Sequence, residues 1–106
     1  MSTEPSRTAT MVLAALAGSA ENALFAAQVR AAAGLDNTRF ETTLADLEKQ
    51  GRIVVTHHSA PDRHLAGDWR TVGLVHTGAS PARAAEAARR YFDRWLRQFL
   101  QHHRCT

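Results

Sequence analysis

The chain has 106 residues, which is enough for one domain but not for two independent hydrophobic cores. Apolar residues make up 44% of the chain, and no stretch approaches the roughly 20 consecutive apolar residues of a membrane-spanning helix. The polar first residues do not have the pattern of a signal peptide, and a single cysteine, Cys105, cannot form an internal disulfide. We therefore expect a cytoplasmic protein with no membrane partner.

The charge balance is slightly basic and arginine-rich, a bias that GC-rich coding also produces, so it is only a mild indication of function. Thirteen basic residues face ten acidic ones, which gives a formal net charge of +3. Twelve of the thirteen are arginines, and Lys49 is the only lysine. The planar fork of arginine matches phosphate groups and base edges.

Three helices are predicted in the first half of the chain. Residues 1–6 are expected to be a flexible leader, and apolar residues at three-to-four spacing predict a helix over residues 8–17. A second helix is predicted over 21–33, and a third over 36–50, capped by Asp36 or Asn37. Each of the three is followed by a glycine, the usual residue just after a helix.

The apolar pattern then changes to a period of two. Residues 52–57 are rich in β-branched side chains and predict a strand, and residues 69–76 predict the returning strand. A polar loop between them carries proline, glycine and two aspartates. The two strands would form a β-hairpin over residues 53–76, so the expected class is mainly α with a small β-hairpin, an α+β fold.

A long helix is predicted at the end of the chain. Ser80 can cap it, Pro81 suits its first position, and it can continue to about residue 102. Its apolar stripe is too wide and aromatic to remain in water, so we expect one part to fold back on the first helix and the remainder to form a homodimer. Purely intramolecular packing is the alternative. The predicted dimer interface consists of Ala88, Tyr91, Phe92, Trp95, Leu96, Phe99 and Leu100.

This order of elements resembles the winged helix-turn-helix family, which includes bacterial and archaeal regulators of the MarR, ArsR and PadR types. The local pattern L-x-x-L-x-x-x-G-x-I/V that recurs there is present here as Leu44, Leu47, Gly51 and Ile53. The resemblance implies a winged-helix domain over residues 7–78, followed by a dimerisation helix over 79–106. Some members carry an extra strand between the first two helices, and no strand is predicted at that place here.

The resemblance also implies how such a domain would bind DNA. Helix 36–50 would enter the major groove, and hairpin 53–76 would lie as a wing along phosphates or the minor groove. Arg39 is the best candidate for a bidentate contact to guanine, threonine methyls suit thymine, and Arg52 would reach a phosphate. The candidate DNA-binding residues are Asn37, Thr38, Arg39, Thr42, Thr43, Arg52, His58, Arg63, His64 and Arg70.

The resulting hypothesis is a homodimeric, sequence-specific protein that binds double-stranded DNA and acts as a transcriptional repressor. No nucleophile elbow, phosphate-binding loop or zinc-protease motif is present, so an enzyme is not expected, and neither a cofactor nor a small-molecule effector is indicated. One alternative is a winged helix used for protein–protein contact. Another is a repressor that responds to metal or redox state through His57, His58 and His64 or through His102, His103 and Cys105, although no metal-ligand spacing supports a site.

Overall fold

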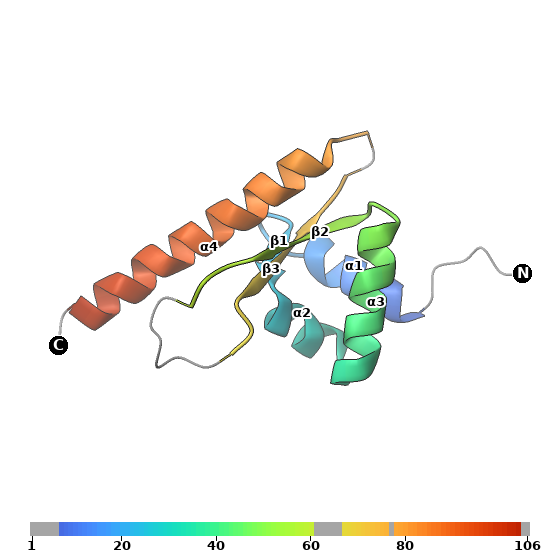
Figure 1. Cartoon of the computed structure of the whole chain (residues 1–106), viewed down its shortest axis with the longest axis horizontal. Coiled ribbons are helices and arrows are strands. Elements are labelled where there is room, and N and C mark those ends of the chain that lie inside the picture. The colour runs from blue at the N-terminus through green and yellow to red at the C-terminus, as the bar shows by residue number, and fades with distance from the viewer. Residues whose placement is uncertain (1–6, 61–66, 77, 105–106) are drawn as a thin grey trace, which may run out of the picture.

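The computed structural model describes residues 7–60, 67–76 and 78–104 and has an α+β fold (Figure 1). The described part of the chain contains four helices and one antiparallel sheet of three strands. In chain order these are α1 (Arg7–Ala17), β1 (Ala23–Phe25), α2 (Ala26–Ala33), α3 (Asn37–Lys49), β2 (Ile53–His57), β3 (Arg70–Leu74) and α4 (Pro81–Arg104). The expected α+β class is confirmed at this level.

The prediction of one helix over residues 21–33 is wrong in its first part, because Ala23–Phe25 form the strand β1. This strand pairs antiparallel with β3, and the N–H of Leu74 donates a hydrogen bond to the carbonyl of Asn22 at 2.9 Å. The helix begins only after Phe25, whose N–H donates to the side-chain oxygen of Gln28 at 2.9 Å. Pairing with a distant strand outweighs the helical spacing of the apolar residues in this segment.

The sheet has the strand order β1-β3-β2, so β3 is the central strand. Val72 of β3 lies opposite Leu24 on one side and Val55 on the other. The sheet therefore contains the predicted hairpin strands and the additional strand β1. None of the described helices is both long and apolar enough to cross a bilayer.

Helices α1, α2 and α3 pack on one face of the sheet and enclose the main hydrophobic core (Figure 1). Burying these side chains stabilises the domain by about 1.5–3 kcal/mol each. Because successive strand residues point to opposite faces, Val72 faces this core while its neighbours Thr71 and Gly73 face away from it. The largest fully buried apolar side chains are Phe40, Leu16, Leu47, Ile53, Val12, Val29 and Val72.

Helix α4 covers the other face of the sheet and contacts all three strands (Figure 1). The expectation that it folds back on the first helix is wrong: its buried residues Ala84, Ala88 and Phe92 pack on the sheet. Gly73 permits this close approach, because a Cβ at that position would lie 2.3 Å from the carbonyl oxygen of Ala84.

Candidate nucleic-acid interface

The first half of α3 presents a polar face to solvent. The Asp36 carboxylate caps the helix by accepting a hydrogen bond from the N–H of Arg39 at 2.8 Å. The Arg39 side chain is 73% exposed, and its Nε lies 3.8 Å from Asp36 Oδ2. Asn37, Thr38 and Thr42 are also exposed. Four of the five candidate residues on the helix are therefore accessible to solvent.

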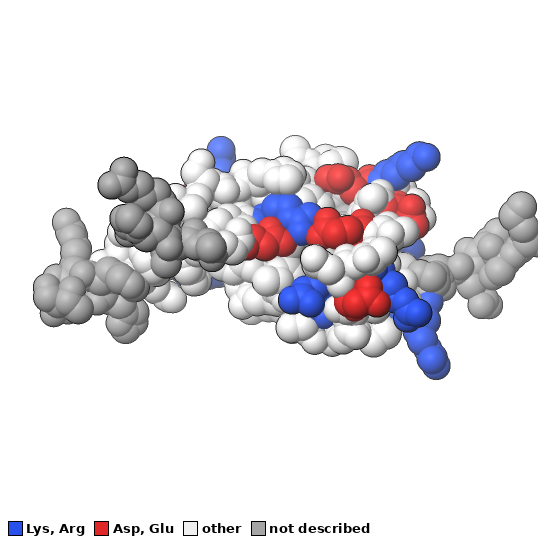
Figure 2. All heavy atoms as spheres, turned by 60° about the horizontal axis from the view of Figure 1, so that its bottom comes forward, with Lys and Arg blue, Asp and Glu red and all other residues white. Residues whose placement is uncertain are grey.

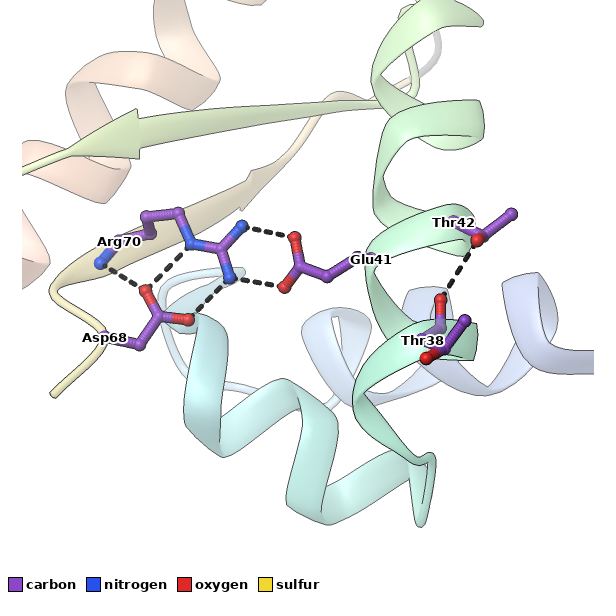
Figure 3. A network of polar contacts seen from close by, with 5 residues as sticks. All are labelled: Thr38, Glu41, Thr42, Asp68 and Arg70. Atoms are coloured by element: carbon purple, nitrogen blue, oxygen red, sulfur yellow. Dashed lines mark hydrogen bonds and ion pairs between the residues drawn. The ribbon is translucent and has the colours of Figure 1, made fainter.

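The neighbouring threonines Thr42 and Thr43 of α3 differ in their surroundings. Thr42 is exposed, and its hydroxyl donates to the carbonyl of Thr38 at 3.0 Å (Figure 3). Thr43 is only 6% exposed, and its hydroxyl donates to the carbonyl of Arg39 at 2.7 Å. The outward placement expected for Thr43 is wrong, because this residue follows Phe40 around the helix toward the core.

Arg70, at the start of β3, is held by two carboxylates (Figure 3). Its guanidinium donates to both oxygens of Glu41 at 2.8 and 2.6 Å, and to both oxygens of Asp68 at 2.8 and 2.6 Å. The hydrogen bonds from Arg70 lower the pKa of both carboxyl groups, and the carboxylates raise the pKa of Arg70. Arg70 therefore fastens β3 to α3 and does not lie free for a phosphate.

His58, the residue after β2, lies on the α4 side of the sheet. Its ring stacks on Phe92 with a centroid distance of 4.0 Å, and its Nε2 is 2.7 Å from the hydroxyl oxygen of the buried Thr71. Burial lowers the pKa of His58, Asp93 opposes this effect and His57 adds to it. His58 thus packs away from α3, and its expected place in a DNA-facing wing is wrong.

The other hairpin candidates are placed only in part. Arg52 is exposed immediately before β2, where its carbonyl accepts a hydrogen bond from the N–H of Val75 at 2.9 Å. Arg63 and His64 lie outside the described residues.

The face that carries α2 and α3 has mixed charge (Figure 2). Acidic and basic side chains lie next to one another on it, and no uniformly basic surface is visible in this view. Arg39 and Arg52 are exposed cations, and Glu41, Asp46 and Glu48 are exposed acids of α3. Because carboxylates repel phosphates, Asp46 and Glu48 make the second half of α3 less suited to contact with a polyanion than the first half.

The predicted dimer residues of α4 differ in how deeply they are buried within the chain. Ala88 and Phe92 are buried against the sheet, and Tyr91, Trp95, Leu96 and Phe99 are half-buried. Phe25 of β1 meets four aromatic rings edge to face. Leu100 remains 49% exposed. Much of the stripe is therefore used inside one chain, and its C-terminal part is the most accessible.

Tyr91 also has an internal partner, since its hydroxyl donates to the side-chain oxygen of Gln28 at 2.7 Å. Sequence reasoning missed this bond and the roles of Glu41 and Asp68. The pairing of Arg70 with Asp68 could have been predicted, because the two residues are only two positions apart. The contact with Glu41 depends on how α3 packs beside β3.

The described residues contain no group of three His, Cys, Asp or Glu side chains that could hold a metal ion. Cys105 and the side chains of His102 and His103 lie outside what the structure describes. Comparisons with models of protein families, with curated proteins and with solved structures returned no match.

Proposed function

We propose that this chain is a homodimeric winged helix-turn-helix protein that binds double-stranded DNA. The observation that carries the proposal is the exposed first half of α3, held beside the start of β3 by the ion pair between Arg70 and Glu41. This pair holds the helix beside the loop end of the hairpin, where Arg70 lies opposite His57. One duplex can then meet both.

The arrangement of the other elements supports the same proposal. Helices α2 and α3 are joined by a short turn in which Gly34 has a positive φ of 66° and the N–H of Leu35 donates to the carbonyl of Arg30. Strand β1 occupies the place, between the first two helices, where some winged-helix proteins carry an extra strand. Two helices joined by a short turn and then two antiparallel strands follow one another in the order expected of a winged helix-turn-helix, which supports the proposal.

The chemistry of α3 suits the major groove near its N-terminus. Arg39 can reach guanine as a bidentate donor, and the exposed Thr38 and Thr42 offer methyl groups to thymine. Arg52 would add a phosphate contact at the start of β2. A two-fold dimer formed through α4 would place two such helices about 34 Å apart on successive major grooves. Occupying a promoter in this way would repress transcription, and a DNA target agrees with a cytoplasmic protein.

A second candidate is a winged helix that binds another protein. The specific observation in its favour is that Arg70 is neutralised by two carboxylates while Asp46 and Glu48 extend the acidic part of α3. In that case α3 would contact a partner with basic side chains. No observation within the described residues favours regulation by metal or redox state.

Selection from a pool of random duplexes, followed by sequencing, tests the proposal. We expect the chain to enrich a two-fold symmetric sequence with half-sites about 34 Å apart. Arg39→Ala should lose preference at one base pair in each half-site, at a cost of about 1–3 kcal/mol. Arg97→Ala, an exposed arginine of α4, is the matched control and should keep the preference. A pool that shows no enrichment would favour the protein-binding candidate.

A further inference from the structure

A cleft lies where the end of α1, the start of β2 and the segment after β3 meet. Its volume is about 480 Å³, which falls in the range of roughly 300–1,000 Å³ that is usual for small-molecule sites. The apolar part of its wall includes Leu13, Leu74 and Val75, all of them half-buried. These side chains are aliphatic, so they offer a hydrocarbon surface to a ligand.

The charged and polar side chains of this cleft are Arg52 and His76, and its lining includes no carboxylate. Within the described part of the chain Arg52 has no ion-pair partner, unlike Arg70. A neighbouring cavity of about 270 Å³, on the other side of Leu74 and His76, contains Glu21 as well as Arg83. The larger cleft is therefore the one whose charge suits an anion.

His76 is oriented by Asn22, whose side-chain Nδ2 lies 2.9 Å from His76 Nε2. When the amide donates this bond, the neutral ring carries its proton on Nδ1, which can then donate to a ligand. Asn22 itself has a positive φ of 56°, and its carbonyl accepts the hydrogen bond from Leu74. The contact between these two side chains thus fixes one polar edge of the cleft.

We propose that this cleft binds a small aliphatic carboxylate. The carboxylate would accept hydrogen bonds from the Arg52 guanidinium and the His76 ring, because arginine matches a carboxylate in a bidentate way. The hydrocarbon chain would lie against Leu13, Leu74 and Val75. No such ligand was indicated by the sequence, since the cleft joins segments that are far apart along the chain.

This inference gains a regulatory meaning that rests on the proposed DNA-binding function. Arg52 is both the cation of the cleft and the predicted phosphate contact at the start of β2. A bound carboxylate would neutralise it and remove that contact from DNA. The log–log dependence of DNA affinity on salt would then fall by about 0.9 per protomer.

Titration of the isotope-labelled chain with hexanoate, followed by NMR of the backbone amides, tests the cleft in the absence of DNA. We expect saturable shifts at Gly51, Arg52 and Val75, with a dissociation constant below ~1 mM. The neutral hexanol and the cationic hexylammonium should give at least tenfold weaker binding. Equal binding of all three, or no saturable shift with hexanoate, would overturn the proposal.

Two variants locate the site. Arg52→Gln should weaken hexanoate binding at least tenfold, whereas Arg83→Gln, in the neighbouring cavity, should not. Ala17→Phe, at an exposed position of the cleft wall, should fill the space and abolish both the shifts and any effect of hexanoate on DNA affinity. Hexanoate binding unaffected by Arg52→Gln and by Ala17→Phe would place the ligand elsewhere and contradict the inference.

The outcomes for the ligand and for DNA can be told apart. Saturable shifts with hexanoate in a chain that binds no duplex would support the carboxylate site and contradict DNA binding. Duplex binding without any shift on addition of hexanoate would support DNA binding and contradict the carboxylate site.

Discussion

At the scale of single residues, Arg70 shows how one side chain can join two elements. Its guanidinium is 20% exposed and pairs with Glu41 from α3 and Asp68 from the segment before β3. The Glu41 side chain is 47% exposed, so water screens part of the attraction. The network is therefore a modest stabiliser, whose main effect is to hold α3 beside the hairpin.

Replacing Arg70 with methionine should lower the free energy of unfolding by about 1 kcal/mol at neutral pH, because it leaves two carboxylates unpaired. The pairing lowers the pKa of Glu41 below 4.5 and also lowers that of Asp68. Its stabilisation is therefore complete above pH 4.5 and is lost as the pH falls through the lower folded-state values. Urea unfolding of both proteins across this range measures the difference. A difference that persists undiminished in strong acid would contradict this account.

His58 should also make the fold less stable in mild acid, because its ring is buried in the neutral form. Burial against Phe92 lowers the pKa of His58 below 6.5, so the folded chain favours the neutral ring. Its stabilisation is complete above pH 6.5 and is lost as the pH falls toward the folded-state value. His58→Phe should lose less stability on acidification than the wild type, as followed by urea unfolding. His76→Phe, at an exposed histidine after β3, is the control, and an equal change in both variants would refute the role of His58.

At the scale of elements, α3 could be predicted from the sequence because its signals are local. Asp36 caps it, and Phe40, Leu44 and Leu47 recur on one side of it. Strand β1 could not be predicted in this way, because Ala23–Phe25 form a strand only by pairing with the distant β3. The bounds of β2, β3 and α4 are close to those predicted, because their signals are also local. The strands have an apolar pattern with a period of two, and α4 begins at a proline.

The candidate interface, like the secondary structure, could be predicted only where the signal is local. The exposure of Arg39 follows from its place on the flank of α3, outside the apolar stripe. The burial of Thr43 could have been expected from its place one turn after Phe40. The pairing of Arg70 and the stacking of His58 depend on contacts between elements distant in the chain. A helical wheel and a count of charges contain no information about such contacts.

The close packing of α4 on β3 leads to a prediction about Gly73. Gly73→Ala would place a methyl group 2.3 Å from the backbone oxygen of Ala84, so α4 must move away from the sheet. We expect a loss of about 3 kcal/mol in the free energy of unfolding, measured with urea. Gly18→Ala is the control, because its added methyl would meet nothing closer than 3.4 Å. Equal stabilities of the two variants would contradict the position of α4.

At the scale of the whole molecule, the sheet separates two surfaces with different properties. The face with α3 is of mixed charge, and α4 on the opposite face has exposed arginines together with an accessible apolar end. Trp95 is in contact with Phe25 and Phe99, so a charged residue there would disturb the fold as well as any dimer. Leu100 is the better probe of self-association.

Leu100→Asp should convert a dimer into a monomer while leaving thermal unfolding of the individual chain nearly unchanged, because Leu100 is 49% exposed. Light scattering should give twice the chain mass for the wild type and the single-chain mass for the variant. Met11→Asp, at the exposed apolar residue of α1, is the matched control and should remain dimeric. A monomeric wild type, or a variant that still dimerises, would contradict the role of α4.

Charge changes on the two surfaces should also affect DNA affinity differently. If α3 meets the duplex, reversing the charge of Arg39 must weaken binding far more than reversing that of Arg97 on α4. Both side chains are exposed, so neither change should disturb the fold.

Fluorescence anisotropy with a labelled duplex at a low and a high salt concentration makes this comparison directly. We predict measurable binding at low salt that weakens as salt rises, because phosphate contacts release counterions. Arg39→Glu should reduce the low-salt affinity at least tenfold, and Arg97→Glu should change it by less than about twofold. Undetectable binding of the wild type at low salt, or a larger loss for Arg97→Glu than for Arg39→Glu, would show that α3 is not a DNA-contacting helix.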